Sequence, residues 1–456
     1  MNKAVENLEH VEEVTRLLSE NASSITFDRL PADVVTVTKH CLLDWLAVTM
    51  AGALEPLTQQ LTDFVSSEGG APQATLIGTG GKVSAGQAAL VNGSAGHALD
   101  YDDVLRLLNG HPTAPVMPAI LAVAENRGAS GRALIEAFVA GVETESRVGG
   151  VMGEGHYAGG WHATGTNGHF GAAAGVARLL GLDCATTAMA LGIAGTQAAG
   201  LKAMFGTMCK PLHAGKAAQN GLFAAEMASR GFISNPAVIE CLQGFGDTQT
   251  DTFAPEKGLD GIGDVFLIPT IRFKYHAACY GTHAPIDAAV TCRENPAFNH
   301  DEVEKIEIRV TSRCLRMCNI PAPTSGLEAK FSLRFTVGLA LCGVDTGRLD
   351  TFDDAIVGRE DVMALCNKGV VVGDDTLERN ESRITVHMRD GTVLSQQTDL
   401  SAPITDLDLT WGRLQTKFRG LAEPIVGAAQ TEQMLEIVSD LENVTSLSPL
   451  LAASAP

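Results

Sequence analysis

The stretch from Gly165 to Gly200, GTNGHFGAAAGVARLLGLDCATTAMALGIAGTQAAG, indicates the fold class. Two segments inside it, 165–180 and 183–200, are rich in Ala and Gly and are apolar on nearly every side. A helix that is hydrophobic all round belongs in the interior of a large protein. The stretch therefore predicts two buried, closely packed helices in the middle of a large all-helical domain.

Further helices of this domain are predicted at 31–52, 113–126, 130–148 and 213–230. A proline stands near the start of three of these segments, and a glycine follows the end of two, as is typical of helix boundaries. The final segment, 407–445, is helical in pattern, and we expect it to return to the same domain.

The pattern changes after about residue 268. Residues 303–310 alternate with period two, which indicates a half-exposed strand, and 384–394 predict a hairpin with an Asp-Gly turn. Helical segments near 328–342 and 350–367 separate these strands. We therefore predict a mainly α protein: a large helical domain over 1–267, completed by 401–456, and a smaller α+β lid domain over 268–400.

The composition excludes two kinds of partner. The 33 basic and 53 acidic side chains give a formal charge of −20, which repels nucleic acid and anionic membranes. The same charge repels anionic substrates at long range. A site for an anion therefore requires a local cluster of Lys, Arg and His.

The cysteines and the N-terminal residues favour a cytoplasmic protein. The ten cysteines include no CxxC pair, as expected for reduced thiols, and the first residues are polar and acidic, unlike a secretory or mitochondrial leader. The longest uncharged stretch, 185–201, is too short and too polar to span a bilayer. We expect no membrane partner.

Three separated segments concentrate acids, bases and cations. The first contains His97, Asp100 and Tyr101, at spacings that would place them on one helical face. In the same segment His111 precedes Pro112 and a predicted helix start, where anions bind favourably. A carboxylate at such a position could act as a general base or could orient a histidine. A solvated helix end and a structural loop histidine are the alternatives.

The second segment pairs Gly160-Trp161-His162 with Lys210-Pro211-Leu212-His213. His162 and His169 are seven residues apart and would share a face of one helix. Pro211 marks a helix start, where free backbone N–H groups, the Lys210 ammonium and the His213 imidazole would bind a carboxylate. The apolar residues on both sides of this motif predict a buried setting rather than a surface lysine.

The third segment contains Lys274, His276, Cys279 and His283, at the predicted domain junction. Two metal sites can be considered: His276 with Cys279 and His283, or His97 with the acidic run that follows it. Neither has the compact ligand spacing of a zinc or iron motif, so we predict no metal. A metal hydrolase and a catalytically silent scaffold remain the alternatives to proton-transfer chemistry.

Taken in order, these motifs resemble the 2-methylcitrate dehydratase family (MmgE/PrpD), which also includes cis-aconitate decarboxylase and iminodisuccinate epimerase. The resemblance rests on the segments DWLAV at 44–48, NGSAGHALDYDD at 92–103, GWH at 160–162, KPLHAGKAA at 210–218 and KYHAACYGTH at 274–283. It implies a helical domain with an α+β lid, a homodimer, and no cofactor in the decarboxylase and epimerase branches.

The resemblance also implies the site. Five residues of this chain would be catalytic: Asp100, His111, His162, Lys210 and Lys274. From the three segments, and for Cys279 also from the resemblance, we expect five residues to contact the substrate, a small anionic di- or tricarboxylate: His97, Tyr101, His213, Cys279 and His283.

Two departures separate this chain from the decarboxylases. Cys279 stands where the decarboxylases often have a histidine, and no tyrosine follows Tyr280, although the decarboxylases use a tyrosine in the lid. We therefore expect an epimerase of a small polycarboxylate, and iminodisuccinate is the substrate that we favour. A 2-methylcitrate-type dehydratase and a cis-aconitate decarboxylase are the alternatives.

Overall fold

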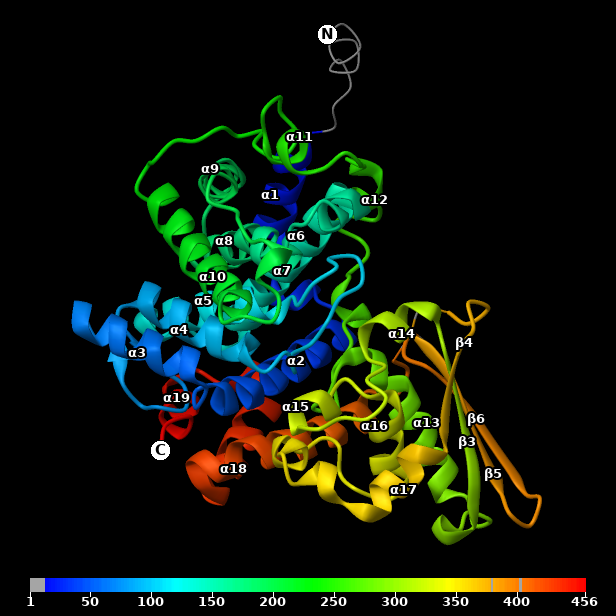
Figure 1. Cartoon of the computed structure of the whole chain (residues 1–456). Helices are drawn as coiled ribbons and strands as arrows, with labels where there is room; N and C mark the ends of the chain where they lie inside the picture. The colour runs from blue at the N-terminus through cyan, green and yellow to red at the C-terminus, as the bar shows by residue number, and fades with distance from the viewer. Residues whose placement is uncertain (1–12, 379, 402–403) are drawn as a thin grey trace, which may run out of the picture. The chain divides into compact units, whose positions relative to one another are not determined.

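The computed structural model describes residues 13–378, 380–401 and 404–456, which form two compact units (Figure 1). The first comprises Met1–Phe273 and Asp406–Pro456, and the second Lys274–Thr405. In its described residues the first unit is helical apart from one short strand pair, and the second combines helices with a four-stranded sheet. The predicted class, mainly α with a smaller α+β part, is confirmed.

The first unit contains α1 Val14–Ser24, α2 Ala32–Gly52, α3 Pro56–Glu68, α4 Ala85–Ala98, α5 Thr113–Arg127, α6 Gly131–Ala158, α7 Ala163–Thr166, α8 Gly168–Leu179, α9 Cys184–Gly195, α10 Cys209–Ala228, α11 Phe245–Gln249, α12 Pro255–Leu259, α18 Leu407–Ser439 and α19 Ser448–Ala453. The short strands β1 (Ala74–Thr75) and β2 (Lys82–Val83) form an antiparallel pair.

Helix α8 occupies the middle of this unit and packs against α5, α6, α9 and α10. Its first ten residues, 168–177, are all buried. The Ala/Gly-rich stretch therefore forms the core helix that its composition predicts, whereas α9 is exposed at its first turn and buried farther along. The glycines of α8 permit this packing, because a Cβ atom on Gly171 would lie 2.6 Å from Oε2 of Glu145 and one on Gly175 would lie 2.9 Å from the carbonyl oxygen of Ala137.

Glycines bring α4 and α10 into close contact. A Cβ atom on Gly93 would lie 2.9 Å from Cα of Gly215, and one on Gly215 would lie 2.2 Å from the carbonyl oxygen of Leu90. Any side chain at either position would force the two helices apart. This contact matters for function because α4 ends, and α10 begins, in the candidate site.

The returning C-terminal segment packs on the N-terminal part of the same unit, where α18 lies along α2. Lys417 on α18 is buried and donates to Asp44 on α2. Among the described helices, α2 alone is long and apolar enough to cross a membrane, but 83% of its most apolar window is buried, as in a core helix.

The second unit has a sheet with strand order β4-β3-β5-β6, made of β3 Val303–Val310, β4 Gly369–Gly373, β5 Glu381–Met388 and β6 Val393–Asp399. The predicted strand at 303–310 and the hairpin with the Asp390-Gly391 turn are confirmed. Strand β4, parallel to β3, is an addition to the prediction. Its sequence, GVVVG, is too short to show the alternation that marks a strand.

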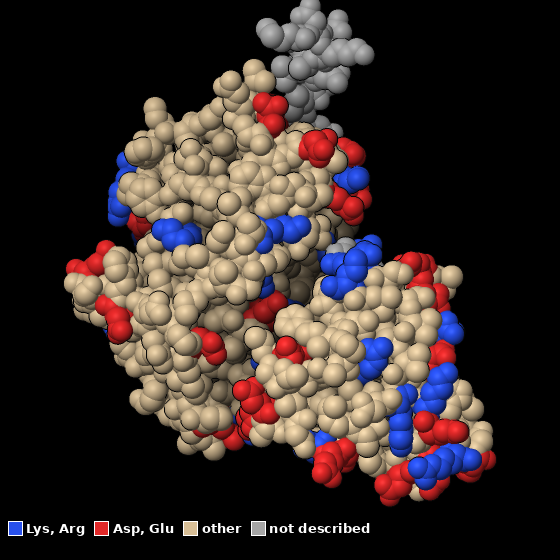
Figure 2. Space-filling view, viewed as in Figure 1, with Lys and Arg blue, Asp and Glu red and all other residues tan. Residues whose placement is uncertain are grey.

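Helices cover one face of this sheet, with α13 against β5 and β6 and α16 behind it (Figure 1). The helices of this unit are α13 His283–Glu294, α14 Ser312–Met317, α15 Gly326–Ala329, α16 Leu333–Leu341 and α17 Glu360–Lys368. The predicted helices at 328–342 and 350–367 are each shorter than expected. In Figure 2 the visible face of this unit carries interspersed positive and negative side chains, whereas that of the helical unit is mostly uncharged.

Candidate functional site

The first part of the site lies where α4 ends. His97 is in the last turn of α4, and Asp100 follows with a φ of +50°, a left-handed conformation that turns the chain back. The carboxylate of Asp102 thereby returns toward the helix, and its Oδ2 lies 2.9 Å from Nδ1 of His97. Both side chains are fully buried. The strained turn therefore creates a buried His–Asp pair.

The predicted shared helical face of His97, Asp100 and Tyr101 is wrong, because α4 ends at Ala98. The ring of Tyr101 is buried and packs against Lys417, whose Nζ lies 3.8 Å from its centroid. The partner of His97 is Asp102, a carboxylate that the sequence interpretation did not single out, although it belongs to the acidic run.

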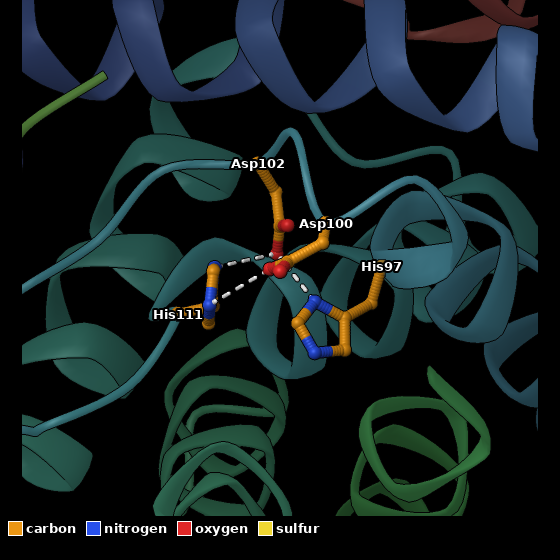
Figure 3. A group of neighbouring side chains, drawn as sticks. All are labelled: His97, Asp100, Asp102 and His111. Carbon is orange, nitrogen blue, oxygen red and sulfur yellow. Dashed lines mark hydrogen bonds and ion pairs between the residues drawn. The ribbon is translucent and has the colours of Figure 1, made fainter. Parts of the chain in front are cut away.

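Asp103 fixes the end of the loop that joins α4 to α5. The backbone N–H of Thr113, the first residue of α5, donates to Oδ1 of Asp103, and the Thr113 hydroxyl lies 2.5 Å from Oδ2. His111 is thereby held beside the acidic run. Its Nδ1 lies 3.1 Å from Oδ2 of Asp102, and its Nε2 lies 3.5 Å from Oδ1 of Asp100 (Figure 3). Asp102 therefore lies between two imidazole rings.

Lys210 enters from α10, the helix that the glycine contact holds against α4. Its Nζ lies 2.9 Å from Oδ1 of Asp100 and 5.5 Å from the ring centroid of Phe205. The expected free N–H groups at this helix start are not found. The N–H of Cys209 donates to the Thr207 hydroxyl, and the N–H of Lys210 donates to the Thr207 carbonyl. An anion here would be bound by the ammonium group rather than by backbone donors.

The prediction that the Lys210 motif is buried on both sides holds only for the residues that follow it. Residues after the motif are mostly buried, but Phe205 and Met208 before it are 39% and 47% exposed. The segment that precedes α10 is therefore a surface loop. Its apolar side chains are exposed beside the lysine rather than packed in the core.

Two further histidines lie next to the first group. His162 precedes α7, and its Nδ1 lies 3.0 Å from Nδ1 of His213 on α10. The ring of His162 stacks on that of His97, with centroids 5.6 Å apart, and the ring of Phe205 meets it edge-on at 5.0 Å. We call the seven residues joined by these contacts the acid–base cluster: His97, Asp100, Asp102, His111, His162, Lys210 and His213.

His169 lies outside this cluster. A new helix, α8, begins between His162 and His169, so the predicted common helical face is wrong. The Nδ1 of His169 donates to the carbonyl of Gly165, and its Nε2 lies 3.1 Å from the amide of Asn220. Both ring nitrogens are occupied, so His169 connects α8 to α10 as a structural residue.

Burial keeps the central imidazoles neutral at neutral pH. Removal from water lowers the pKa of His97 to about 4, and the pKa values of His162 and His213 are also lowered, first by burial and then by nearby positive charge, including that of Lys210. A neutral imidazole can accept a proton. These histidines are therefore candidate general bases beside a permanent cation.

The buried carboxyl groups behave in opposite ways. Burial alone would raise the pKa of Asp102, but His111 and His97 outweigh it and hold this pKa well below its usual range. Burial, together with the charge of Asp44, raises the pKa of Asp103 to about 8. Asp102 is therefore ionised at neutral pH, while the adjacent Asp103 is mostly protonated.

The remaining predicted residues belong to the second unit. Lys274 is buried, and Cys279 packs on the core of that unit. His283 lies 3.1 Å from the carbonyl of Ala278. These contacts are all internal to the second unit. That Lys274, Cys279 and His283 take part in the site stays a prediction.

Of the two groups of potential metal ligands in the sequence, the structure assembles the one around His97. One ligand atom from each of His97, Asp100, Asp102 and His111 lies within 4.8 Å of the others. Imidazole nitrogens with carboxylate oxygens can hold a divalent transition metal. Among the described residues, His276, Cys279 and His283 do not form such a group; His276 instead bonds Asp287 and Thr346.

These contacts assemble acids, bases and a cation, the groups that enzymes use to transfer protons. Family models support this class: the MmgE/PrpD N-terminal domain matches residues 16–257, and the MmgE/PrpD C-terminal domain matches 276–443. The chain belongs to the MmgE/PrpD family, a family of enzymes.

Curated relatives are similar to this chain over most of its length. A cis-aconitate decarboxylase-like protein, oryM, from Aspergillus oryzae is 28% identical, covering 93% of each chain. The cis-aconitate decarboxylase of Aspergillus terreus is 26% identical, covering 96% of this chain and 95% of its own. That of Homo sapiens is 29% identical, covering 81% and 80%.

Proposed function

We propose that this enzyme transfers a proton at a carbon next to a carboxylate of a small di- or tricarboxylate. The single observation that supports this is the contact between Lys210 and Asp100, with Nζ 2.9 Å from Oδ1, beside imidazoles that burial keeps neutral. A cation that already pairs with a carboxylate is suited to bind the carboxylate of a substrate. The neutral rings beside it are suited to accept a proton.

The chemistry follows from charge. A carbon next to a carboxylate is a very weak acid, and its proton leaves only if the charge that develops on the carboxylate oxygens is stabilised. In this proposal Lys210 stabilises that charge, and His162 takes the proton from carbon. His213, 3.0 Å from His162, can accept the proton onward, and the ionised Asp102 orients His97 and His111.

The finer proposal is epimerisation, with iminodisuccinate as the named substrate. One base removes the proton, the electron pair of the C–H bond moves into the enolate, and a second group returns a proton to the opposite face. Two sequence features favour this outcome over decarboxylation: Cys279 at a position where the decarboxylases often have a histidine, and the lack of a tyrosine after Tyr280.

The names of the relatives favour a second candidate, decarboxylation of cis-aconitate. There the bond from carbon to a carboxylate breaks, carbon dioxide leaves, and the electron pair stays on carbon next to the remaining unsaturated acid. A protonated side chain then delivers a proton to that carbon. The same cation and imidazoles would serve, because both reactions pass through a carbanion stabilised by neighbouring carboxylate.

The oligomeric state is part of the proposal. Family resemblance supports a homodimer, and several large apolar side chains of the helical unit are exposed, including Leu54, Phe64, Phe223 and Ile233. Light scattering coupled to size exclusion would test this; a mass of one chain at micromolar concentration would contradict it.

Proton NMR in D2O tests the function, with separate samples of iminodisuccinate stereoisomers, cis-aconitate and 2-methylcitrate. Deuterium entering iminodisuccinate as its isomers interconvert supports epimerisation. Carbon dioxide loss from cis-aconitate supports the second candidate, and water loss from 2-methylcitrate would replace both with dehydration. No reaction in any sample, from folded enzyme, would contradict these substrates.

A further inference from the structure

Four side chains of the acid–base cluster form a group whose chemistry goes beyond proton transfer. These are His97, Asp100, Asp102 and His111, called here the quartet, and their ligand atoms lie within 4.8 Å of one another. Figure 3 shows the two carboxylates pointing toward each other between the two imidazole rings. Two nitrogens and two oxygens converge on one small volume.

We propose that the quartet binds a divalent transition-metal ion of the Zn²⁺ or Co²⁺ type, and that the bound ion inhibits the enzyme. Such ions take imidazole nitrogen and carboxylate oxygen at roughly 2.0–2.2 Å. In a tetrahedral site the ligand atoms are then roughly 3.3–3.6 Å from one another. The ligand atoms of the quartet lie within 4.8 Å of one another, so its side chains must move closer together when the ion binds.

An unsatisfied buried atom points to the same site. Oδ1 of Asp102 is buried and has no hydrogen-bond partner among the described residues, and Asp102 is 1% exposed. A buried polar atom without a partner is costly, and a bound ion would remove part of that cost. Ligation by Nδ1 of His97 would move its proton to Nε2, so the ring could bind the metal in its neutral form.

Lys210 decides how tightly the ion binds. Its ammonium lies 2.9 Å from Asp100 and neutralises one of the two carboxylates of the quartet. An incoming dication must share Asp100 with Lys210 or displace it. The resting enzyme therefore favours the lysine, and removal of that charge should strengthen metal binding.

The expected inhibition follows from the groups that the ion would occupy. Metal ligation removes the basic lone pair of one nitrogen on each of His97 and His111, and it takes the carboxylate of Asp102 that orients both rings. The inhibition by the bound ion is inferred on the basis of the proposed function. The binding itself is not, since it follows from the arrangement of the quartet.

Titration with Co²⁺ tests binding without any substrate, because nitrogen and oxygen ligands in tetrahedral geometry give visible absorption bands. We expect one Co²⁺ per chain, displaced by Zn²⁺. Replacing a ligand, as in His97→Gln or Asp102→Asn, should weaken binding at least about 10-fold. Lys210→Met should instead tighten it several-fold, a result that a general loss of folding cannot imitate.

A matched control is available in the second unit. His276 also pairs with a carboxylate, with Nε2 3.1 Å from Oδ1 of Asp287, but it lies outside the quartet. His276→Gln should bind Co²⁺ as the wild type does. No bands at millimolar Co²⁺, or equal affinity in the wild type and in His97→Gln, would overturn the site.

Activity measurements test whether the bound ion inhibits the enzyme. With the substrate that the NMR assay identifies, Zn²⁺ at the concentration that displaces Co²⁺ should abolish turnover, and EDTA should restore it. Activation by Zn²⁺ would overturn the inhibitory role while leaving the site in place. The two failures are distinguishable: a missing Co²⁺ spectrum rejects the metal site, whereas lack of any turnover rejects the proposed function.

Discussion

The ammonium of Lys210 lies 2.9 Å from the carboxylate of Asp100, although 110 residues separate them in the chain (210 minus 100). Two conditions produce this contact. The left-handed turn at Asp100 exposes its carboxylate at the end of α4, and the glycines of α4 and α10 let the start of α10 approach that point.

Replacing Lys210 with Met should reduce kcat/KM by about 10²–10³-fold, the cost of removing one fixed charge-stabilising group from an enzyme site. The fold should persist, because Lys210 is partly exposed at the beginning of a helix. Turnover of the substrate and circular dichroism check the two parts. Lys216→Met is the matched control: this lysine is exposed on the same helix and bonds Gln219. Equal activity of both variants would remove Lys210 from the site.

Asp102→Asn should lower kcat about 10²-fold and change KM little. Asp102 is buried and acts through His97 and His111, so its charge affects the reacting rings rather than the binding of substrate. Asparagine keeps the shape of the side chain, which limits any effect on folding. Steady-state kinetics separates the two parameters; a rise in KM with unchanged kcat would show that Asp102 binds the substrate instead.

Phe205→Ala should move the acid limb of the pH–rate profile to higher pH. The ring of Phe205 covers His162, whose pKa is lowered chiefly by burial. Water admitted by the smaller side chain would raise that pKa toward its ordinary value of 6.5, so the base would be lost to protonation at a higher pH. Phe205→Leu should keep the limb of the wild type. An unmoved limb in Phe205→Ala would exclude His162 as the base that limits the rate.

The stability of Asp103→Asn should depend on pH in a specific direction. The pKa of Asp103 is raised to about 8 in the folded protein, so its stabilising effect is complete below the unfolded value of 3.8 and is lost as the pH rises toward 8. Asparagine resembles the protonated acid and can keep both contacts with Thr113. Urea unfolding should therefore show a variant that is more stable than the wild type at pH 8.5, with a difference that becomes smaller as the pH falls to 5 and toward the unfolded pKa. A variant that is less stable at both pH values would contradict this assignment.

Lys417→Met should destabilise the helical unit by about 3–5 kcal/mol, because it leaves the Asp44 charge buried without its cation. The double variant Asp44→Asn/Lys417→Met removes both charges and should recover part of the loss. Thermal or urea unfolding measures both. Additive losses in the double variant would mean that the two side chains do not interact as the 2.6 Å contact indicates.

Local sequence was enough to predict the fold class. The apolar Ala/Gly segment indicated buried helix, which α8 confirms, and period-two alternation at 303–310 indicated a strand with one covered face, which β3 confirms. These patterns depend on neighbours within one turn or one strand. Strand β4 shows the limit: five residues, GVVVG, carry no period, and only pairing with β3 makes them a strand.

Local sequence also identified most residues of the acid–base cluster, but not the contacts between them. His97, Asp100, His111, His162, Lys210 and His213 could each be singled out because ionisable side chains stood in apolar, Gly-rich surroundings. Their partners could not be predicted. Helical spacing selected Tyr101 and not Asp102 as a neighbour of His97. That spacing does not apply here, because the helix ends at Ala98.

By itself, then, the sequence determined most of the helices, the strands with a clear period, and the residue types available for proton transfer. The tertiary structure decided which of those residues meet: Asp102 between two imidazoles, Lys210 on Asp100, and His162 on His213. The physical reason is one of range. Hydrophobic periodicity and capping act over a few neighbouring residues, whereas hydrogen bonds and pKa shifts depend on distances of a few ångströms between segments that are far apart in the chain.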